Sequence, residues 1–270
     1  MKQMETGLEK PAKDRILFIN PVGHGDWDAE VKKVLEEAKR ETTEVEVISL
    51  KRGPRHLEYH YYEALIAADL LHCLKQAEKD GFAAVVIGCF YDPFLREAKE
   101  IAGRMIVTAP AEASLQIAAC LGNSFSIIVG RRKWIPAMRK NVYEYGLRDK
   151  LASFRSVDLG VLDFHADERR TERRLREEAQ KAVEEDGAEV IILGCTMQFG
   201  FYRELQKQLG VPVIDVVLAP FKQAEYLVDL KKRFGWSYSK AGGYERPPVR
   251  EIKEWGIEEQ YGIPGLWTED

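Results

Sequence analysis

The sequence has little that would suit it to a membrane, to export or to nucleic acid. Its apolar runs fall far short of the roughly 20 residues that cross a bilayer, and its polar start, MKQMETGLEKPAKD, lacks the apolar core of a secretory signal. The 40 Lys and Arg are scattered among 44 Asp and Glu, so no basic stripe is available to displace counterions from phosphates. We therefore expect a cytoplasmic protein with no membrane or nucleic-acid partner.

Cysteines are scarce, and familiar metal and nucleotide motifs are missing. Four cysteines in 270 residues are too few for a disulfide framework. The sequence contains no HExxH, CxxC or Walker-type loop. Four histidines show no ligand spacing for a metal: His56, His60, His72 and His165. The residues therefore give no reason to expect a metal or another cofactor.

Short apolar runs alternate with amphipathic segments of helical length. Runs rich in Val and Ile predict strands at residues 15–20, 44–49, 83–88, 104–109, 125–130, 153–158, 189–194 and 211–216. The segments between them predict helices at residues 28–41, 61–80, 93–102, 167–186 and 221–234. This alternation is typical of parallel βαβ units with helices on both faces of a sheet.

The chain also contains an internal repeat centred on two cysteines. The segment DGFAAVVIGC ends at Cys89, and DGAEVIILGC ends at Cys195, 106 positions later. Each copy is followed by a further short strand that runs into an Ala-Pro pair, at 109–110 and 219–220. A period of this length is too long for a solenoid and indicates two similar lobes.

We therefore predict an α/β fold of two similar lobes, each a four-stranded, mainly parallel sheet flanked by helices. The lobes are expected to be related by a pseudo-twofold axis, with the active site in the cleft between them. The predicted division gives a disordered leader at 1–14, a first lobe at 15–112 plus 216–270, and a second lobe at 113–215. The tail from 236 to 270 lacks clean periodicity, so we expect it to wrap the surface or join an interface.

Cys89 and Cys195 each stand where a parallel strand is expected to end. Ligands bind beyond such strand ends, because loops and helix starts present unpaired N–H groups there. Gly88 and Gly194 allow a sharp turn, and the helix after each cysteine is expected to lower the thiol pKa. Two facing thiols suit inversion of a carbon centre, since one removes a proton and the other delivers one to the opposite face. A small buried residue is the ordinary interpretation of one such cysteine, whereas the matched pair favours catalysis.

Several segments together resemble a known family. The two cysteine motifs, the repeated lobes and other matching segments are similar to the aspartate/glutamate racemase superfamily, and within it to the hydantoin/allantoin racemase branch. The superfamily signals are GCFYDP (88–93), GCTMQFG (194–200) and GVPVIDVVLAPFKQAEYL (210–227). The branch signals are INP (19–21), GPRHLEYHYYEALIA (53–67), FSIIVGRRKWIPAMRKNVYEYGL (125–147) and SKAGGYERP (239–247).

The resemblance implies a cofactor-independent racemase or epimerase. Cys89 and Cys195 would be the two acid/base thiols, acting on a stereocentre next to a carbonyl in a hydantoin-like or amino-acid-derived small molecule. Neither a metal nor pyridoxal phosphate is implied, and the branch suggests a homo-oligomer. A backbone amide is expected to stabilise the enolate oxygen as it forms.

The strand-end loops supply the candidate substrate-binding residues, which are Asn20, Pro21, His24, Phe90, Gly130, Arg131 and Thr196. Asn20 and Thr196 can donate hydrogen bonds to a carbonyl or carboxylate. His24 is either a ligand-binding group or an exposed loop histidine, and Arg131 either pairs with a carboxylate or has a surface role. Asp92 and Glu112 are expected to cap helices instead.

Two other functions fit the same residues. A lyase or decarboxylase of the superfamily would form an enolate by loss of carbon dioxide and reprotonate it with one cysteine. A non-catalytic binding protein would also place two lobes around a cleft. The presence of both cysteines favours the racemase.

Overall fold

The computed structural model describes residues 13–268. The predicted leader at 1–14 lies outside the described residues except for its last two, and the second of these, Asp14, already begins the first strand. No helix within the described part of the chain is long and apolar enough to cross a membrane.

Within residues 13–268, eight strands form two four-stranded sheets, and every pairing within them is parallel. The first sheet has the order β2-β1-β3-β4 and the second the order β6-β5-β7-β8, so the two sheets share one topology. The predicted fold class and all eight predicted strands are confirmed. The strands are β1 (Asp14–Asn20), β2 (Thr43–Ser49), β3 (Ala84–Ile87), β4 (Ile106–Thr108), β5 (Phe125–Val129), β6 (Leu151–Ser156), β7 (Val190–Leu193) and β8 (Val213–Ile214).

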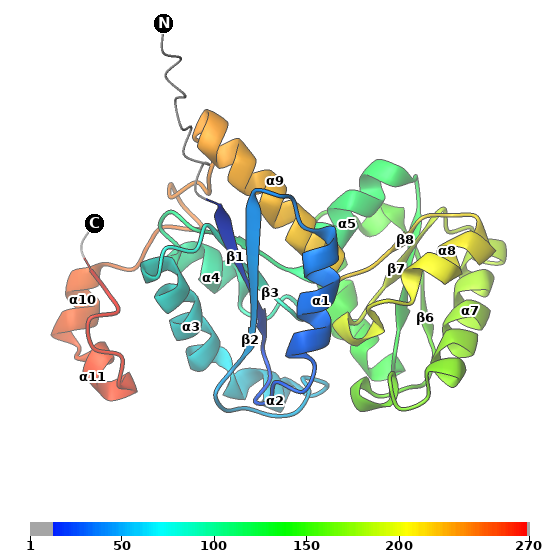
Figure 1. The fold of residues 1–270 in the computed structure, drawn as a ribbon, viewed down its shortest axis with the longest axis horizontal. Coiled ribbons are helices and arrows are strands. Elements are labelled where there is room, and N and C mark those ends of the chain that lie inside the picture. Colours follow the sequence, from blue (N-terminus) through cyan, green and yellow to red (C-terminus); the bar gives the residue numbers. More distant parts are fainter. Residues whose placement is uncertain (1–12, 269–270) are drawn as a thin grey trace, which may run out of the picture.

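Helices cover both faces of each sheet, and Figure 1 shows the two resulting lobes side by side. The α-helices are α1 (Asp28–Ala38), α2 (His60–Leu65), α3 (Ala67–Lys79), α4 (Leu95–Ile101), α5 (Pro110–Leu121), α6 (Ile135–Glu144), α7 (Glu168–Glu184), α8 (Tyr202–Leu209), α9 (Leu218–Phe234), α10 (Val249–Glu254) and α11 (Ile257–Tyr261). The described part of the chain also contains the short 3-10 turns η1 (Arg132–Trp134), η2 (Arg148–Lys150), η3 (Val161–Asp163) and η4 (Thr196–Gln198).

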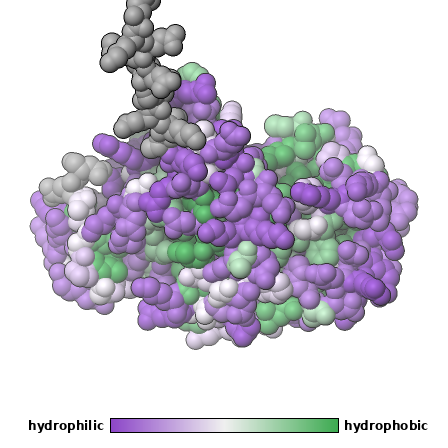
Figure 2. Space-filling view, viewed as in Figure 1, coloured by the Kyte–Doolittle hydropathy of each residue, from purple (hydrophilic) through white to green (hydrophobic). Residues whose placement is uncertain are grey.

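Helix α7 illustrates how composition sets local structure. Asp167 accepts a hydrogen bond from the Arg170 N–H and so caps the first turn. Leu175, Ala179 and Ala182 form a buried stripe at helical spacing, while the charged residues between them face solvent. Figure 2 shows that the face of the molecule in this view is mainly hydrophilic, with apolar patches among the polar residues.

The lobes exchange helices at their junction. Helix α5 follows the first sheet but packs on β7 of the second, and α9 follows the second sheet but packs on β1, β3 and β4 of the first. The two helices also pack against each other. The Thr108 hydroxyl, at the end of β4, donates to the Pro220 carbonyl in the first turn of α9 at 2.9 Å. The helix exchange therefore holds the two sheets together at this junction.

Two segments differ in detail from the prediction. The single helix expected at 61–80 is two helices, α2 and α3, with the break at the fully buried Ile66. The tail does wrap the surface, and it also contains the short helices α10 and α11, which lie beside α3 at the outer end of the first lobe (Figure 1). The Tyr238 hydroxyl contacts both the N–H and the carbonyl of Val107, at 2.8 and 2.6 Å, and thereby covers the open edge of β4.

Candidate active site

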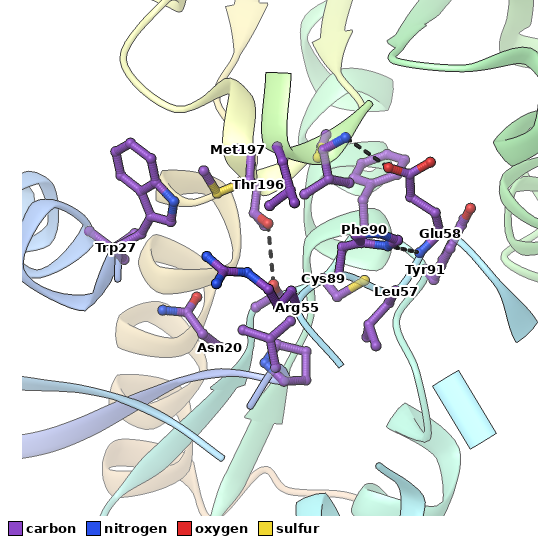
Figure 3. Close-up of a pocket in the computed structure, with 18 of the residues that line it drawn as sticks. Asn20, Trp27, Arg55, Leu57, Glu58, Cys89, Phe90, Tyr91, Thr196 and Met197 are labelled. Carbon is purple, nitrogen blue, oxygen red and sulfur yellow. Dashed lines mark hydrogen bonds between the residues drawn. The ribbon is translucent and has the colours of Figure 1, made fainter. Parts of the chain in front are cut away.

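The strand ends of both sheets meet at one cavity of about 90 Å³. Cys89, directly after β3, and Cys195, directly after β7, both line it. Figure 3 shows Cys89 among side chains from both lobes, including Asn20 and Thr196. Most of the wall is apolar, as in a small-molecule site where a few polar groups fix orientation. The two repeat cysteines are thus brought to a single site.

The two cysteine loops have matching backbone hydrogen bonds. Each cysteine N–H donates to the carbonyl two residues earlier at 2.9 Å, and each cysteine carbonyl accepts from the N–H three residues later, also at 2.9 Å. The preceding glycines are required, because a Cβ on Gly88 would lie 2.4 Å from the Phe18 ring and one on Gly194 would lie 2.7 Å from Ile127. The neighbouring strand therefore packs directly against each strand end and fixes the following thiol.

Burial disfavours the thiolate form of both cysteines, which corrects one expectation. Burial raises the pKa of Cys195 to about 12, although the Met197 N–H opposes the shift. Burial also raises the pKa of Cys89, where the Tyr91 N–H lowers it and the neighbouring Cys195 raises it. The predicted lowering by helix starts was wrong because α4 begins only at Leu95, and a 3-10 turn rather than an α-helix follows Cys195. Repulsion between the two sulfurs disfavours ionisation of both at once.

Five of the seven predicted substrate-binding residues line the cavity, namely Asn20, Pro21, His24, Phe90 and Thr196. The Thr196 hydroxyl donates to the Gly88 carbonyl at 3.3 Å, so it links the two cysteine loops (Figure 3). The Asn20 amide donates to the Asp28 carboxylate at 2.6 Å, and this hydrogen bond orients the Asn20 side chain at the end of β1. His24 Nε2 lies 3.0 Å from the Arg55 carbonyl and His24 is not an exposed loop residue.

Gly130 and Arg131 lie outside the cavity wall. A Cβ on Gly130 would lie 2.3 Å from the Trp134 ring and 2.4 Å from the Leu159 carbonyl, so this glycine serves close packing beneath Trp134. Arg131 donates to the Glu58 carboxylate at 2.6 Å and lines the open groove outside the cavity. Its guanidinium is therefore already engaged by a carboxylate of the protein.

Sequence reasoning missed most of the wall contributed by the loop before α2. Glu58 follows a Pro-containing segment whose course no periodicity predicts. Figure 3 shows Arg55, Leu57 and Glu58 beside Cys89. Other lining residues that were missed are Val22, Trp27, Asp28, Val31, His56, Tyr91, Trp134, Met138, Val161, Leu162 and Met197.

Glu58 fastens the first lobe to the second. Its carboxylate is buried and accepts from the Val161 N–H at 2.9 Å and from Arg131 at 2.6 Å, both in the second lobe. Burial by itself raises the pKa of Glu58, but these two donors lower it more, so the pKa lies below its ordinary value. We therefore expect Glu58 to line the cavity as a carboxylate at neutral pH.

Replacing Glu58 by alanine is expected to lower the free energy of unfolding by about 1–3 kcal/mol, because the Val161 N–H loses its acceptor. The ion pair adds less, since Arg131 is 42% exposed. Urea unfolding followed by circular dichroism measures the change. The matched control is Glu46→Ala, which breaks a surface pair with Arg15 and should cost under about 1 kcal/mol. Equal effects of the two changes would contradict the interlobe role of Glu58.

Asp92 caps a helix, as expected, but this helix is α5 rather than α4, the helix that follows Asp92 in the chain. Its carboxylate accepts from the Ala111 and Glu112 N–H groups at the start of α5, both at 2.7 Å, and from the Tyr145 hydroxyl at 2.8 Å. Burial raises the pKa of Asp92 to about 7, although these donors oppose the shift. The Cys89 loop is thereby tied to both lobes. Glu112, in contrast, pairs with Lys99.

No group of three or more His, Cys, Asp or Glu side chains between residues 13 and 268 is arranged to hold a metal ion. The polar groups that face the cavity are hydrogen-bonding and acid/base side chains rather than a ligand shell.

The fold and the site define a two-lobed α/β protein in which each sheet contributes one cysteine to a shared cavity. Residues 16–224 match the model of the Asp/Glu/hydantoin racemase family. The chain belongs to this family, and within it to the hydantoin racemase type, which confirms the resemblance found in the sequence.

The matches to similar proteins cover nearly the whole length of those proteins. A hydantoin racemase from Paenarthrobacter aurescens is 37% identical over 88% of this chain and 99% of that protein. A hydantoin racemase from Pseudomonas sp. (strain NS671) is 35% identical over 88% of this chain and 93% of that protein. An allantoin racemase structure from Klebsiella pneumoniae is 30% identical with a TM-score of 0.81, covering 87% of this chain and 94% of that one. An arylmalonate decarboxylase structure at 17% identity shares the fold alone.

Proposed function

We propose that this protein is a cofactor-independent racemase that inverts the stereocentre of a hydantoin-like cyclic ureide or a related amino-acid derivative. The observation that carries the proposal is that Cys89 and Cys195 line one cavity from the ends of two equivalent strands. The identity of about 35% to hydantoin racemases supports the same substrate class.

The proposed mechanism uses one thiolate and one thiol. The thiolate of one cysteine removes the proton from the carbon next to the carbonyl, and the thiol of the other donates a proton to the opposite face. The product leaves the two cysteines with exchanged protonation states, ready for the reverse direction. Because the neighbouring sulfurs disfavour double ionisation, the site is suited to hold a single thiolate.

We further propose that the chain forms a homo-oligomer and that its lobes divide at 15–112 plus 216–270 and 113–215. The packing of α9 on the first sheet supports this division, since α9 follows the second sheet in the chain. Sedimentation velocity tests the oligomer, and a monomer at assay concentration would contradict it.

The function is tested by NMR-detected proton exchange in heavy water over a panel of 5-substituted hydantoins, allantoin and free amino acids, with optical rotation followed in parallel. Exchange accompanied by loss of rotation is the expected result for at least one hydantoin. Release of carbon dioxide from a malonate-type acid without racemisation would instead identify a lyase. Binding without either reaction would identify a non-catalytic binding protein.

A further inference from the structure

An open groove adjoins the cavity between the lobes. The groove has a volume of about 560 Å³, against about 90 Å³ for the cavity, and the two share the lining residues His56, Glu58 and Leu162. Figure 3 shows Glu58 on the side of the cavity where Cys89 lies. The groove therefore continues the cavity outward from the catalytic candidates. The other charged residues that line it come from the second lobe and are Arg131, Arg132, Lys133, Asp158 and Asp163.

The acidic side chains of the groove already have partners within the protein. Glu58 is paired with Arg131 at 2.6 Å, and Asp158 lies 3.4 Å from Arg174. Asp163 accepts from a backbone N–H three residues earlier in the chain, at 2.8 Å. Basic side chains therefore balance two of the three carboxylates, and the third holds the backbone of its own turn.

Lys133, in contrast, forms no ion pair with any of the described residues. Its ammonium lies 4.9 Å from the centre of the Tyr59 ring, and a ring face attracts a cation without cancelling its charge. The Tyr59 ring lies 6.1 Å from the ring of His56, which belongs to the wall shared by the groove and the cavity. An unbalanced positive charge is thus held close to the place where the cavity opens into the groove.

We propose that the groove receives the C5 substituent of the substrate and that Lys133 favours a substituent that ends in a carboxylate. The inference rests on the proposed function and names a substrate class, which is hydantoins with an acidic side chain. A hydantoin ring whose C5 atom lies at the two thiols leaves a longer substituent to extend into the adjoining space. The apolar part of that substituent would pack on Leu162, and its carboxylate would accept from the Lys133 ammonium.

The test compares two hydantoins of nearly the same shape, one with a 2-carboxyethyl and one with a 2-carbamoylethyl substituent at C5. The wild-type protein is expected to show a kcat/KM about 3- to 10-fold higher for the acid than for the amide. Lys133→Met should bring this ratio toward one, and Lys133→Glu should invert it, because a carboxylate there repels the acid. Added salt should also lower the ratio, since the groove is open to solvent.

The matched control is Lys140→Met, which removes an exposed lysine of α6 that pairs with Glu144 and does not line the groove. This variant should keep the wild-type ratio. A ratio that is the same in the wild type, Lys133→Met and Lys133→Glu would overturn the inference. An equal loss for the acid and the amide in Lys133→Met would show a packing role only and would also overturn it.

Dissociation constants of the same two hydantoins, measured by isothermal titration calorimetry, supply a readout that does not depend on turnover. Tighter binding of the acid that Lys133→Glu abolishes, without racemisation, supports the groove as the binding site and contradicts the proposed function. Racemisation of both hydantoins at a ratio that Lys133→Glu leaves unchanged overturns the role of Lys133 and supports the proposed function. Binding of neither hydantoin at millimolar concentrations contradicts both.

Discussion

Replacement of either Cys89 or Cys195 by serine is expected to reduce racemisation by about 10³-fold or more. Both thiols line the cavity, and a two-base mechanism needs an acid on one face of the carbon and a base on the other. A serine hydroxyl is a far weaker acid than a thiol, so it neither forms the base nor readily delivers the proton. Loss of optical rotation, followed with each purified variant, measures the effect. The double variant should be about as inactive as either single one, because the two groups act as a unit.

Cys120→Ser is the matched control for the cysteine variants. Cys120 is an exposed thiol on α5 and does not line the cavity, so this variant should retain wild-type activity. A fully active Cys89→Ser variant would contradict the two-base mechanism. It would favour instead a reaction that requires a single cysteine, such as reprotonation after decarboxylation.

The value of kcat/KM is expected to rise about tenfold per pH unit between pH about 7 and about 9. Burial raises the pKa of both cavity thiols, that of Cys195 to about 12, so we expect nearly all molecules to carry two neutral thiols at neutral pH. Below the pKa, each unit of pH increases the thiolate fraction tenfold. The second thiol remains protonated and able to donate, so no loss of the acid is expected in this range. Initial rates, corrected for uncatalysed racemisation at each pH, measure the profile.

Two controls keep this profile interpretable. A hydantoin methylated at the ring nitrogen between its carbonyls cannot lose that proton, so its profile reports the enzyme alone. The thiol pKa values are higher in the folded protein than in the unfolded chain, so the folded protein is most stable, as far as these groups are concerned, below the ordinary thiol pKa. This contribution to the free energy of unfolding is lost as the pH rises toward the thiol pKa values of the folded protein. Circular dichroism must therefore accompany the most alkaline points. A kcat/KM that is constant from neutral pH upward would contradict neutral thiols in the free enzyme.

The strands were predictable because they are buried on both faces. In β3, all four residues of Ala84–Ile87 are buried, and such a strand appears in the sequence as an uninterrupted apolar run. The boundary between α2 and α3 was not predictable, since the break falls at the apolar, fully buried Ile66, which nothing in the local sequence pattern marks as a helix end. The helices of the tail were missed because α10 and α11 have six and five residues, too few to show a period.

The cavity was predictable only where sequence position alone implies spatial position. Asn20, Phe90 and Thr196 adjoin strand ends, and parallel strands present their ends at one edge. Glu58 belongs to a loop that is held by contacts with the other lobe, and Trp134 belongs to the turn η1, which is too short to show a period. For the same reason Arg131 was predicted at the substrate and lies instead on Glu58.

The sequence by itself determined the two α/β lobes, the repeated Gly-Cys strand ends and the family, because each depends on local pattern and on the repeat. Tertiary structure decided the state of the thiols. The expected lowering of their pKa by helix starts is outweighed by burial in a mainly apolar cavity, which disfavours the charged form. Burial is a property of all the residues that surround a group, and residues distant in the sequence supply most of them here.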